Sequence, residues 1–176
     1  MSAHEDDLAG RAAALRREFD RAFAEPPRVT VTDLEDFLAV RAGPDRYVLR
    51  VAELAGLFAD KKVLRLPTPV PELLGIAGFR SEVVPVYDLR ALLGYGVGAA
   101  TRWLALTKRG PIALAFDAFE GHLRVPREQI ASDGGGGAHL RGVLRTADSV
   151  RPIVDLVSVL DAVERRARAQ LSREET

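Results

Sequence analysis

The side chains that could carry out catalysis or bind a metal are few and widely spaced. The chain of 176 residues contains no Cys, which excludes disulfides, thiolate catalysis and Cys-ligated metals. His4, His122 and His139 do not combine with one another or with carboxylates at metal-ligand spacing, so we expect no metal and no cofactor. Ser81 and Ser132 have no nucleophile-elbow motif and no His nearby in the sequence. These patterns predict that the protein is not an enzyme.

Three aspartates, Asp88, Asp117 and Asp155, are the remaining candidates for acid or base chemistry. Asp88 and Asp155 stand directly before LRALL and LVSVL, whose aliphatic residues have helical spacing. A helix N-cap is a simpler role for both, and its loss costs about 1 kcal/mol. The more unusual feature is GIAGFRSEVVPV, where Arg80 and Glu82 lie beside an apolar strand. An Arg in that setting needs an acidic partner or a role at an interface.

The segment that contains Arg80 is followed by the first copy of an internal repeat. VVPVYDLRALL begins at Val83 and VRPIVDLVSVL begins at Val150, an offset of 67 residues. The same offset holds upstream, over about twenty residues without a gap, which favours an internal duplication. The matching pairs are Leu73 and Leu140, Gly75 and Gly142, Ile76 and Val143, Pro85 and Pro152, Asp88 and Asp155, Leu89 and Leu156, and Leu93 and Leu160.

Short apolar runs separated by turn residues predict the elements that position these side chains. We expect strands or strand edges within residues 29–40, 45–54, 83–89, 102–107, 111–116 and 150–156. Residues 41–46, 94–101 and 107–111 have the composition of turns, and the last predicts a hairpin. Such regular punctuation favours an all-β barrel or sandwich, and the repeat favours two small barrels.

Two helices flank the predicted strands. Residues 5–24 have apolar residues at helical spacing, with acids first and arginines later, and Pro26 and Pro27 end that helix. Residues 154–171 continue the second copy of the repeat as a helix with an Arg-rich outer face.

Charge and hydropathy narrow the possible partners. Lys and Arg together number 25, as do Asp and Glu, so the net charge is zero and no global field attracts nucleic acid. The N-terminus is acidic without an apolar stretch, and no apolar run is long enough to span a membrane. We therefore expect a soluble cytoplasmic protein.

The segment LLGIAGFRSEVVPVYDLRALLG resembles the signature of the CheW family of chemotaxis coupling proteins. The resemblance covers about residues 33–163, and its central motif is specific. It departs from the family at Ser81, where members almost always have Gly; if that Gly adopts a positive φ, Ser81 strains the turn or indicates a different one. Further similar segments are DFLAVRAGPDRYVLRVAELAGL (36–57), PIALAFDAFEGHLRVPREQI (111–130, with Asp117) and LRGVLRTADSVRPIVDLVSVL (140–160).

The resemblance implies an all-β fold with short helices. It predicts two five-stranded SH3-like barrels related by a pseudo-two-fold axis, to which this chain adds an N-terminal helix. The domain organisation would be an amphipathic helix and Pro linker over 1–28, a CheW-like domain of two interleaved barrels over 29–165, and a charged tail over 166–176.

The resemblance also implies a scaffold with two partners. These are the regulatory domain of a CheA-like histidine kinase, which meets an apolar face, and the cytoplasmic tip of a chemoreceptor, whose hairpin enters the groove between the barrels. Glu53 and Arg80 match a neighbouring acid and arginine of the family, so we predict a charge-assisted pair near the interaction surface. The candidate partner-binding set is Val51, Glu53, Leu54, Phe79, Arg80, Ser81 and Glu82.

Two alternatives stay open at this point. A specialised member that binds only the kinase or only the receptor is permitted by Ser81 and by the added N-terminal helix. A small-barrel enzyme or oligonucleotide binder would require a pocket with perturbed titratable groups, or a basic groove with aromatic platforms. If the protein is an adaptor or a specialised member of the family, we expect it to associate with receptor arrays in the cytoplasm.

Overall fold

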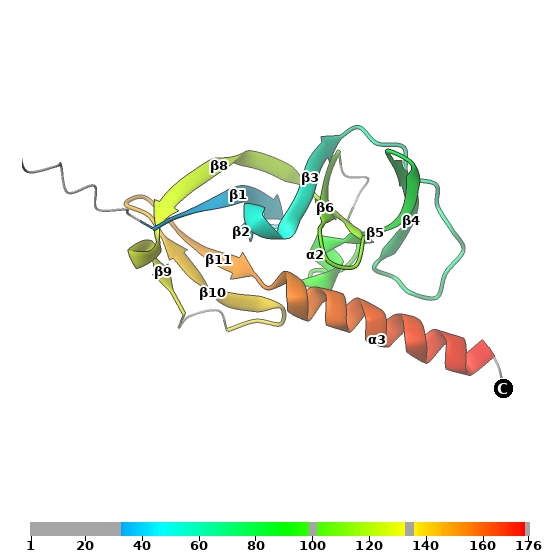
Figure 1. Ribbon diagram of the computed structural model, residues 1–176. Helices are drawn as coiled ribbons and strands as arrows, with labels where there is room; N and C mark the ends of the chain where they lie inside the picture. Colours follow the sequence, from blue (N-terminus) through cyan, green and yellow to red (C-terminus); the bar gives the residue numbers. More distant parts are fainter. Residues whose placement is uncertain (1–32, 99–101, 133–135, 175–176) are drawn as a thin grey trace, which may run out of the picture. The chain divides into compact units, whose positions relative to one another are not determined.

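The computed structural model describes residues 33–98, 102–132 and 136–174 (Figure 1). The helix predicted over residues 5–24 lies outside these ranges. The strands are β1 (Leu34–Ala42), β2 (Asp45–Arg50), β3 (Leu54–Ala59), β4 (Leu73–Phe79), β5 (Glu82–Asp88), β6 (Trp103–Thr107), β7 (Ala113–Phe116), β8 (Ala118–Pro126), β9 (Ile130–Ala131), β10 (Leu140–Arg145) and β11 (Val150–Val154). The helices are the 3₁₀ turns η1 (Val51–Glu53) and η2 (Arg127–Gln129) and the α-helices α2 (Leu89–Leu92) and α3 (Leu156–Glu174).

The strands form two sheets that exchange strands between the two halves of the chain. One sheet has the order β8-β1-β2-β11-β10-β9 and the other has the order β3-β6-β7-β5-β4. The all-β class with two small, interleaved sheets is thus confirmed. One detail differs from the prediction: the first sheet has six strands, because the two-residue β9 adds to its edge. The helix predicted over residues 154–171 is α3, which has 19 residues.

The internal repeat is visible in the register of two equivalent hairpins. In the β4–β5 hairpin Ile76 lies opposite Pro85, and in the β10–β11 hairpin Val143 lies opposite Pro152. Each proline precedes the point where its strand pairs with a parallel neighbour, at Val86 for β5 and at Ile153 for β11. The missing N–H of proline therefore interrupts neither parallel ladder, although both strands are central in their sheets.

Asp88 and Asp155 occupy the predicted capping positions. The Asp88 carboxylate accepts hydrogen bonds from the N–H groups of Arg90 (2.9 Å) and Gly98 (2.8 Å). The Asp155 carboxylate accepts from the N–H groups of Val157 (3.2 Å) and Ser158 (3.3 Å) at the start of α3. These bonds satisfy donors that the first turn of a helix leaves without partners.

Replacing the two caps by Ala is expected to have unequal effects. Asp88 is 1% exposed and also holds the loop at Gly98, so Asp88→Ala should lower the free energy of unfolding by about 2 kcal/mol, the upper end for a cap. Asp155→Ala, at a half-buried position, should cost about 1 kcal/mol. Urea unfolding of both variants measures the difference. An equal loss would mean that the bond to Gly98 contributes nothing.

A shared core joins the two sheets. Its buried residues come mainly from β1, β2 and β11 of one sheet, from β3, β5, β6 and β7 of the other, and from α2 and α3. Two smaller clusters each lie largely within one sheet, around Val84 and Val86 in the five-stranded sheet and around Phe37 and Ile153 in the six-stranded sheet. Burial of this apolar surface is the main stabilising term, and the shared cluster couples the two sheets in one unit.

Candidate functional site

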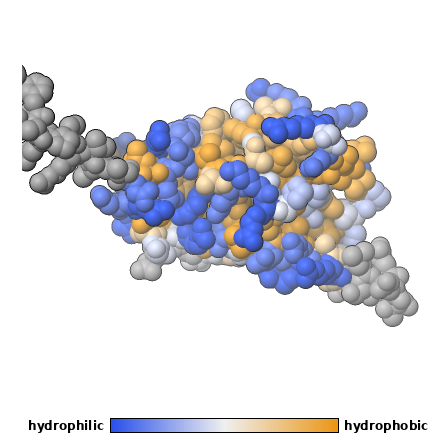
Figure 2. Space-filling model, in the orientation of Figure 1, coloured by the Kyte–Doolittle hydropathy of each residue, from blue (hydrophilic) through white to orange (hydrophobic). Residues whose placement is uncertain are grey.

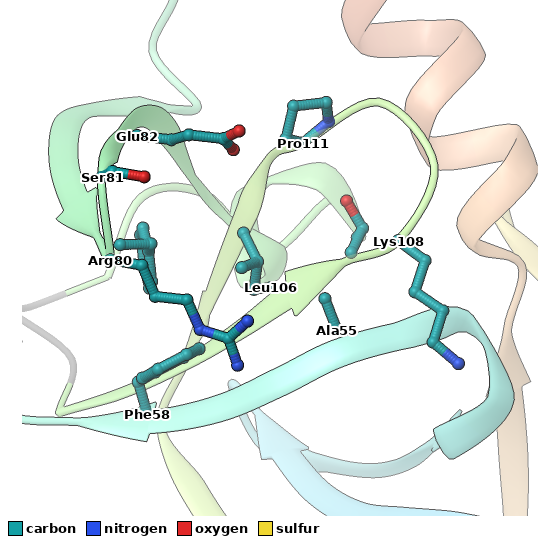
Figure 3. Close-up of a pocket in the computed structure, with 10 residues that line it drawn as sticks. Ala55, Phe58, Arg80, Ser81, Glu82, Leu106, Lys108 and Pro111 are labelled. Atoms are coloured by element: carbon teal, nitrogen blue, oxygen red, sulfur yellow. The ribbon is translucent and has the colours of Figure 1, made fainter.

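The β4–β5 turn forms one wall of a groove of about 530 Å³, here called the Arg80 groove (Figure 3). Its lining comes from β3, from the β4–β5 turn, and from the β6–β7 hairpin. The groove thus brings together four residues of the predicted partner-binding set that are adjacent in the sequence. The lining residues are Ala55, Phe58, Phe79, Arg80, Ser81, Glu82, Leu106, Thr107, Lys108 and Pro111.

Two aromatic rings form the apolar part of this groove. Phe58 and Phe79 meet edge to face, with their ring centroids 4.9 Å apart, a geometry that adds to the energy of simple burial. The Lys61 ammonium lies 5.5 Å from the centroid of each ring and donates to the Gly78 carbonyl oxygen (3.2 Å). This cation–π arrangement fixes Lys61 at the edge of the groove.

Arg80 is held in a backbone conformation that is unusual for a residue with a side chain. It is the first residue of a two-residue turn between Phe79 and Glu82, and its φ is +55°. The side chain is exposed, extends over β3 near Phe58 and Leu106 (Figure 3), and forms no ion pair or hydrogen bond with another described residue. The guanidinium, unpaired among the described residues, thus lies beside an apolar groove on a turn whose backbone conformation is strained.

The residue at position 81 does not carry the strain of this turn. Among the described residues other than Gly, positive φ occurs at Asp60, Arg80 and His139 and therefore not at Ser81. The concern that Ser81 replaces a Gly that needs positive φ does not apply to this turn, because the strained position is one residue earlier. Ser81 is exposed and lines the groove beside Glu82.

The predicted pair between Glu53 and Arg80 is wrong. Glu53 lies on η1, where the chain crosses from β2 to β3, and its Oε1 is 3.4 Å from Nη2 of Arg141 on β10. The two predicted partners line different grooves. The positions of Glu53 and Arg80 in the sequence do not indicate which groove each residue lines.

Glu53 lines a second groove of about 490 Å³, here called the junction groove, next to η1. Val51 also lines it, whereas Leu54 is 7% exposed and belongs to the shared core. Leu54 therefore supports the groove from beneath and does not form its surface. The residues of the junction groove are Leu34, Glu35, Asp36, Arg50, Val51, Ala52, Glu53, Lys108 and Arg127.

Lys108 lines both grooves and was not predicted. Its backbone N–H donates to the Glu53 carbonyl oxygen (3.0 Å) and its Nζ donates to the Ala52 carbonyl oxygen (2.8 Å). The β6–β7 hairpin thereby holds η1 in place, and Lys108 separates the Arg80 groove from the junction groove. In the sequence, the only feature that marked Lys108 was its place in TKRGP, which has the composition of a hairpin turn.

Burial perturbs the Glu53 carboxyl group. Desolvation raises the pKa of Glu53, and the positive charges of Arg141 and Arg50 oppose this change without cancelling it. Asp155 and Glu35 add to the rise. The Oε2 atom is buried and has no hydrogen-bond partner among the described residues, which is consistent with an ionised form that is disfavoured in this position.

The raised pKa of Glu53 predicts a pH-dependent stability. A carboxyl group whose folded-state pKa lies above its unfolded value of about 4.5 stabilises the fold below that pH. This contribution is lost as the pH rises through the folded-state pKa. Glu53→Gln should remove it, so the difference in free energy of unfolding between wild type and variant should fall between pH 4 and pH 7. Urea unfolding across this range measures the difference.

Arg141→Gln is the matched control for the Glu53 prediction. It removes the positive charge that most lowers the pKa of Glu53, so the pH dependence should become larger. A pH profile that is the same in wild type and Glu53→Gln would contradict the assignment.

A third surface feature is apolar and lies at the edge strand β4. Leu64 and Leu66 are 58% and 41% exposed, and the Leu64 backbone pairs with Ile76 through bonds of 2.8 and 2.9 Å. Figure 2 shows hydrophobic surface over this part of the five-stranded sheet. We call Leu64 and Leu66 the Leu64 surface. Lys61, Lys62 and Arg65, which are close to Leu64 in the sequence, are also exposed.

Other kinds of site find little support in the described part of the chain. Residues 33–98, 102–132 and 136–174 contain no group of three or more His, Asp or Glu residues that could hold a metal. Of the helices that the structure describes, none has the length and hydropathy required to cross a membrane.

Comparison with known proteins bears directly on the fold. The family model described as CheW-like domain matches residues 36–164. The crystal structure of the scaffolding protein TtCheW from Thermoanaerobacter tengcongensis is similar, with a TM-score of 0.62 and 18% sequence identity over 68% of this chain and 88% of that chain. None of the curated proteins matches this chain. The family match covers more than half of the sequence, and the chain therefore belongs to the CheW-like domain family.

Proposed function

We propose that this protein is a chemosensory adaptor that holds a CheA-type histidine kinase and a chemoreceptor in a fixed relative geometry. CheW-family proteins are scaffolds and not enzymes, and the adaptor acts through binding surfaces alone. The observation that carries the proposal is the presence of two separate grooves around one shared core, within a domain of this family. A cytoplasmic location at receptor arrays follows from the two partners.

The surfaces differ in chemistry, which supports different partners. The Leu64 surface and the adjacent five-stranded sheet offer apolar contact, as expected for docking onto the kinase regulatory domain. The junction groove is lined by three acids and three bases beside Val51 and Leu34, which suits a receptor hairpin with polar and apolar side chains. Arg80 belongs to neither surface, and its guanidinium, which has no ion-pair or hydrogen-bond partner among the described residues, sets register rather than bulk affinity.

Co-sedimentation tests the proposal. The purified protein is mixed with the cognate kinase and, separately, with a cytoplasmic fragment of the receptor. Binding to both partners is the expected result. Binding to only one would favour a specialised member of the family, and binding to neither would exclude both readings. The junction groove has equal numbers of acids and bases, and the Arg80 groove has two bases against one acid. Neither groove is basic enough to support an oligonucleotide binder.

A further inference from the structure

Two segments predicted only as turns meet in the structure, and the proposed function uses neither. They are the β1–β2 hairpin, around Gly43, and the loop that follows α2, around Tyr95. The hairpin belongs to the six-stranded sheet, whereas α2 continues directly from β5 of the five-stranded sheet. Any bond between the two segments therefore connects the two sheets.

Tyr95 makes this connection with its hydroxyl group and its ring. The hydroxyl donates to the Asp45 carboxylate and lies 2.5 Å from the Tyr47 hydroxyl. The ring lies against Gly43, where a Cβ would be 3.2 Å from Tyr95 Cγ and where φ is +66°. The hydrogen bond to Asp45 is the main cause that raises the pKa of Tyr95, so the phenol remains a donor at neutral and moderately alkaline pH.

Asp117 also bonds the β1–β2 hairpin. It is the residue between β7 and β8, where the chain crosses from the five-stranded to the six-stranded sheet. Its carboxylate accepts from the Gly43 N–H (2.5 Å), and its own N–H donates to the Arg41 carbonyl oxygen (3.0 Å). The hairpin is thus fixed by polar bonds from two segments of the chain.

The internal repeat shows that this arrangement is specific to one half. Gly110 is the equivalent of Gly43 at the offset of 67 residues and also has a positive φ, but its neighbour is the aliphatic Leu160. The difference arises because α2 ends after four residues and the chain turns back, which brings Tyr95 over the hairpin, whereas α3 continues to Glu174. The Gly43 hairpin thus has a polar connection to the loop after α2. The Gly110 hairpin instead contacts α3 through Leu160 and bonds η1 through Lys108.

We propose that Asp45, Tyr47, Tyr95 and Asp117 form an inter-sheet clip that fixes the relative orientation of the two sheets and thereby the shape of the junction groove. Clip and groove lie at opposite ends of β1 and β2: Leu34 and Arg50 line the groove, whereas Ala42 and Asp45 border the clip. Strands of this length, roughly 20–30 Å at about 3.3 Å per residue, transmit a rotation at one end to the other. Tyr95 is then a positioning residue for partner binding.

Distance measurement between the sheets tests the clip without any partner. The chain has no Cys, so Val83→Cys and Val150→Cys introduce spin labels at two strand positions that are 70% and 61% exposed, one on each sheet. In this background we expect a narrow distance distribution, which Tyr95→Phe should broaden. Tyr95→Phe in the label-free chain should also weaken binding of the receptor fragment by about three- to tenfold, the range for coupling through a packed network.

Thr146→Val is the matched control for loss of a hydroxyl group. Thr146 Oγ1 bonds the carbonyl oxygen (3.1 Å) and the hydroxyl (2.9 Å) of Ser149 within a single hairpin. Thr146→Val should therefore lower stability without broadening the distance distribution between the spin labels. An unchanged distribution in Tyr95→Phe would overturn the clip, whatever the binding result. The expected effect of the clip on receptor binding at the junction groove rests on the proposed function. If the distribution broadens while the wild type binds no receptor fragment, the clip stands and the proposed partner falls.

Discussion

Arg80→Gly is expected to weaken association with the partner that contacts the Arg80 groove by roughly thirtyfold, which corresponds to about 2 kcal/mol for loss of an interfacial Arg. The same change should leave the free energy of unfolding unchanged or raise it by up to about 1 kcal/mol, because Gly adopts a φ of +55° without strain. Binding should weaken while stability stays the same or rises, because the guanidinium has no partner among the described residues whose loss would destabilise the fold. Co-sedimentation and urea unfolding measure them separately.

Two further variants at the same position separate charge from backbone strain. Arg80→Lys keeps the positive charge and the strain but loses the planar fork, so we expect intermediate binding and wild-type stability. Arg80→Ala keeps the strain and loses the charge, so it should bind as weakly as Arg80→Gly and be less stable than it. Wild-type binding by Arg80→Gly would contradict a recognition role, and unfolding of Arg80→Ala would assign Arg80 a structural one.

The parts of the fold that were predictable are those in which residue types with strong local preferences recur. Proline restricts the backbone and Asp caps a helix wherever they occur. Pro85 and Asp88, and Pro152 and Asp155, therefore showed the strand and the helix start that follows it in both halves. The β-strand class followed from short apolar runs between turn residues. These signals are local and do not depend on which strands become neighbours.

The exchange of strands between the sheets was not predictable from local signals. Residues 45–54 were predicted as one strand, but the structure breaks it at η1, where the chain crosses to the other sheet. RVAEL contains neither Gly nor Pro, and the break is stabilised by the distant Lys108.

The strand β8, by contrast, was predictable from the alternation of its residues. Leu123 and Val125 point inward, whereas His122 and Arg124 are exposed.

The candidate site divides in the same way. Phe79, Arg80, Ser81 and Glu82 line one groove because they are consecutive across a tight turn. Their neighbours Phe58 and Lys108 come from β3 and the end of β6, which no periodicity relates to that turn. The Glu53–Arg80 pair failed for the same reason: a one-dimensional match of residue types does not determine which charged groups share a groove.

Gly75→Ala should have the largest effect on stability of the changes considered for this chain. A Cβ at Gly75 would lie 2.1 Å from the carbonyl oxygen of Leu64, and its φ is +143°. The nearest atoms belong to the backbone and are fixed by the Leu64–Ile76 bridge, so the clash cannot be relieved by a rotamer change. We expect a loss of about 3 kcal/mol or more, equivalent to roughly 10 °C in melting temperature for a domain of this size.

Gly78→Ala in the same strand is the matched control, since no atom lies within 4 Å of the Cβ position at Gly78 and the φ of Gly78 is not positive. The stability of this variant should differ from that of the wild type by less than about 1 kcal/mol.

Gly142→Ala extends the prediction to the second copy of the repeat, because there a Cβ would lie 2.4 Å from the Ala131 carbonyl oxygen at a φ of +80°. Leu64 and Ala131 are themselves separated by the repeat offset. The register of the β4–β5 hairpin shifts between Leu73 and Gly75, and that of the β10–β11 hairpin shifts between Leu140 and Val143. At each shift an earlier segment of the chain approaches the glycine too closely for any side chain. Thermal unfolding of the three variants should therefore group Gly75→Ala with Gly142→Ala and apart from Gly78→Ala. Similar melting temperatures for all three would contradict a steric role for these glycines.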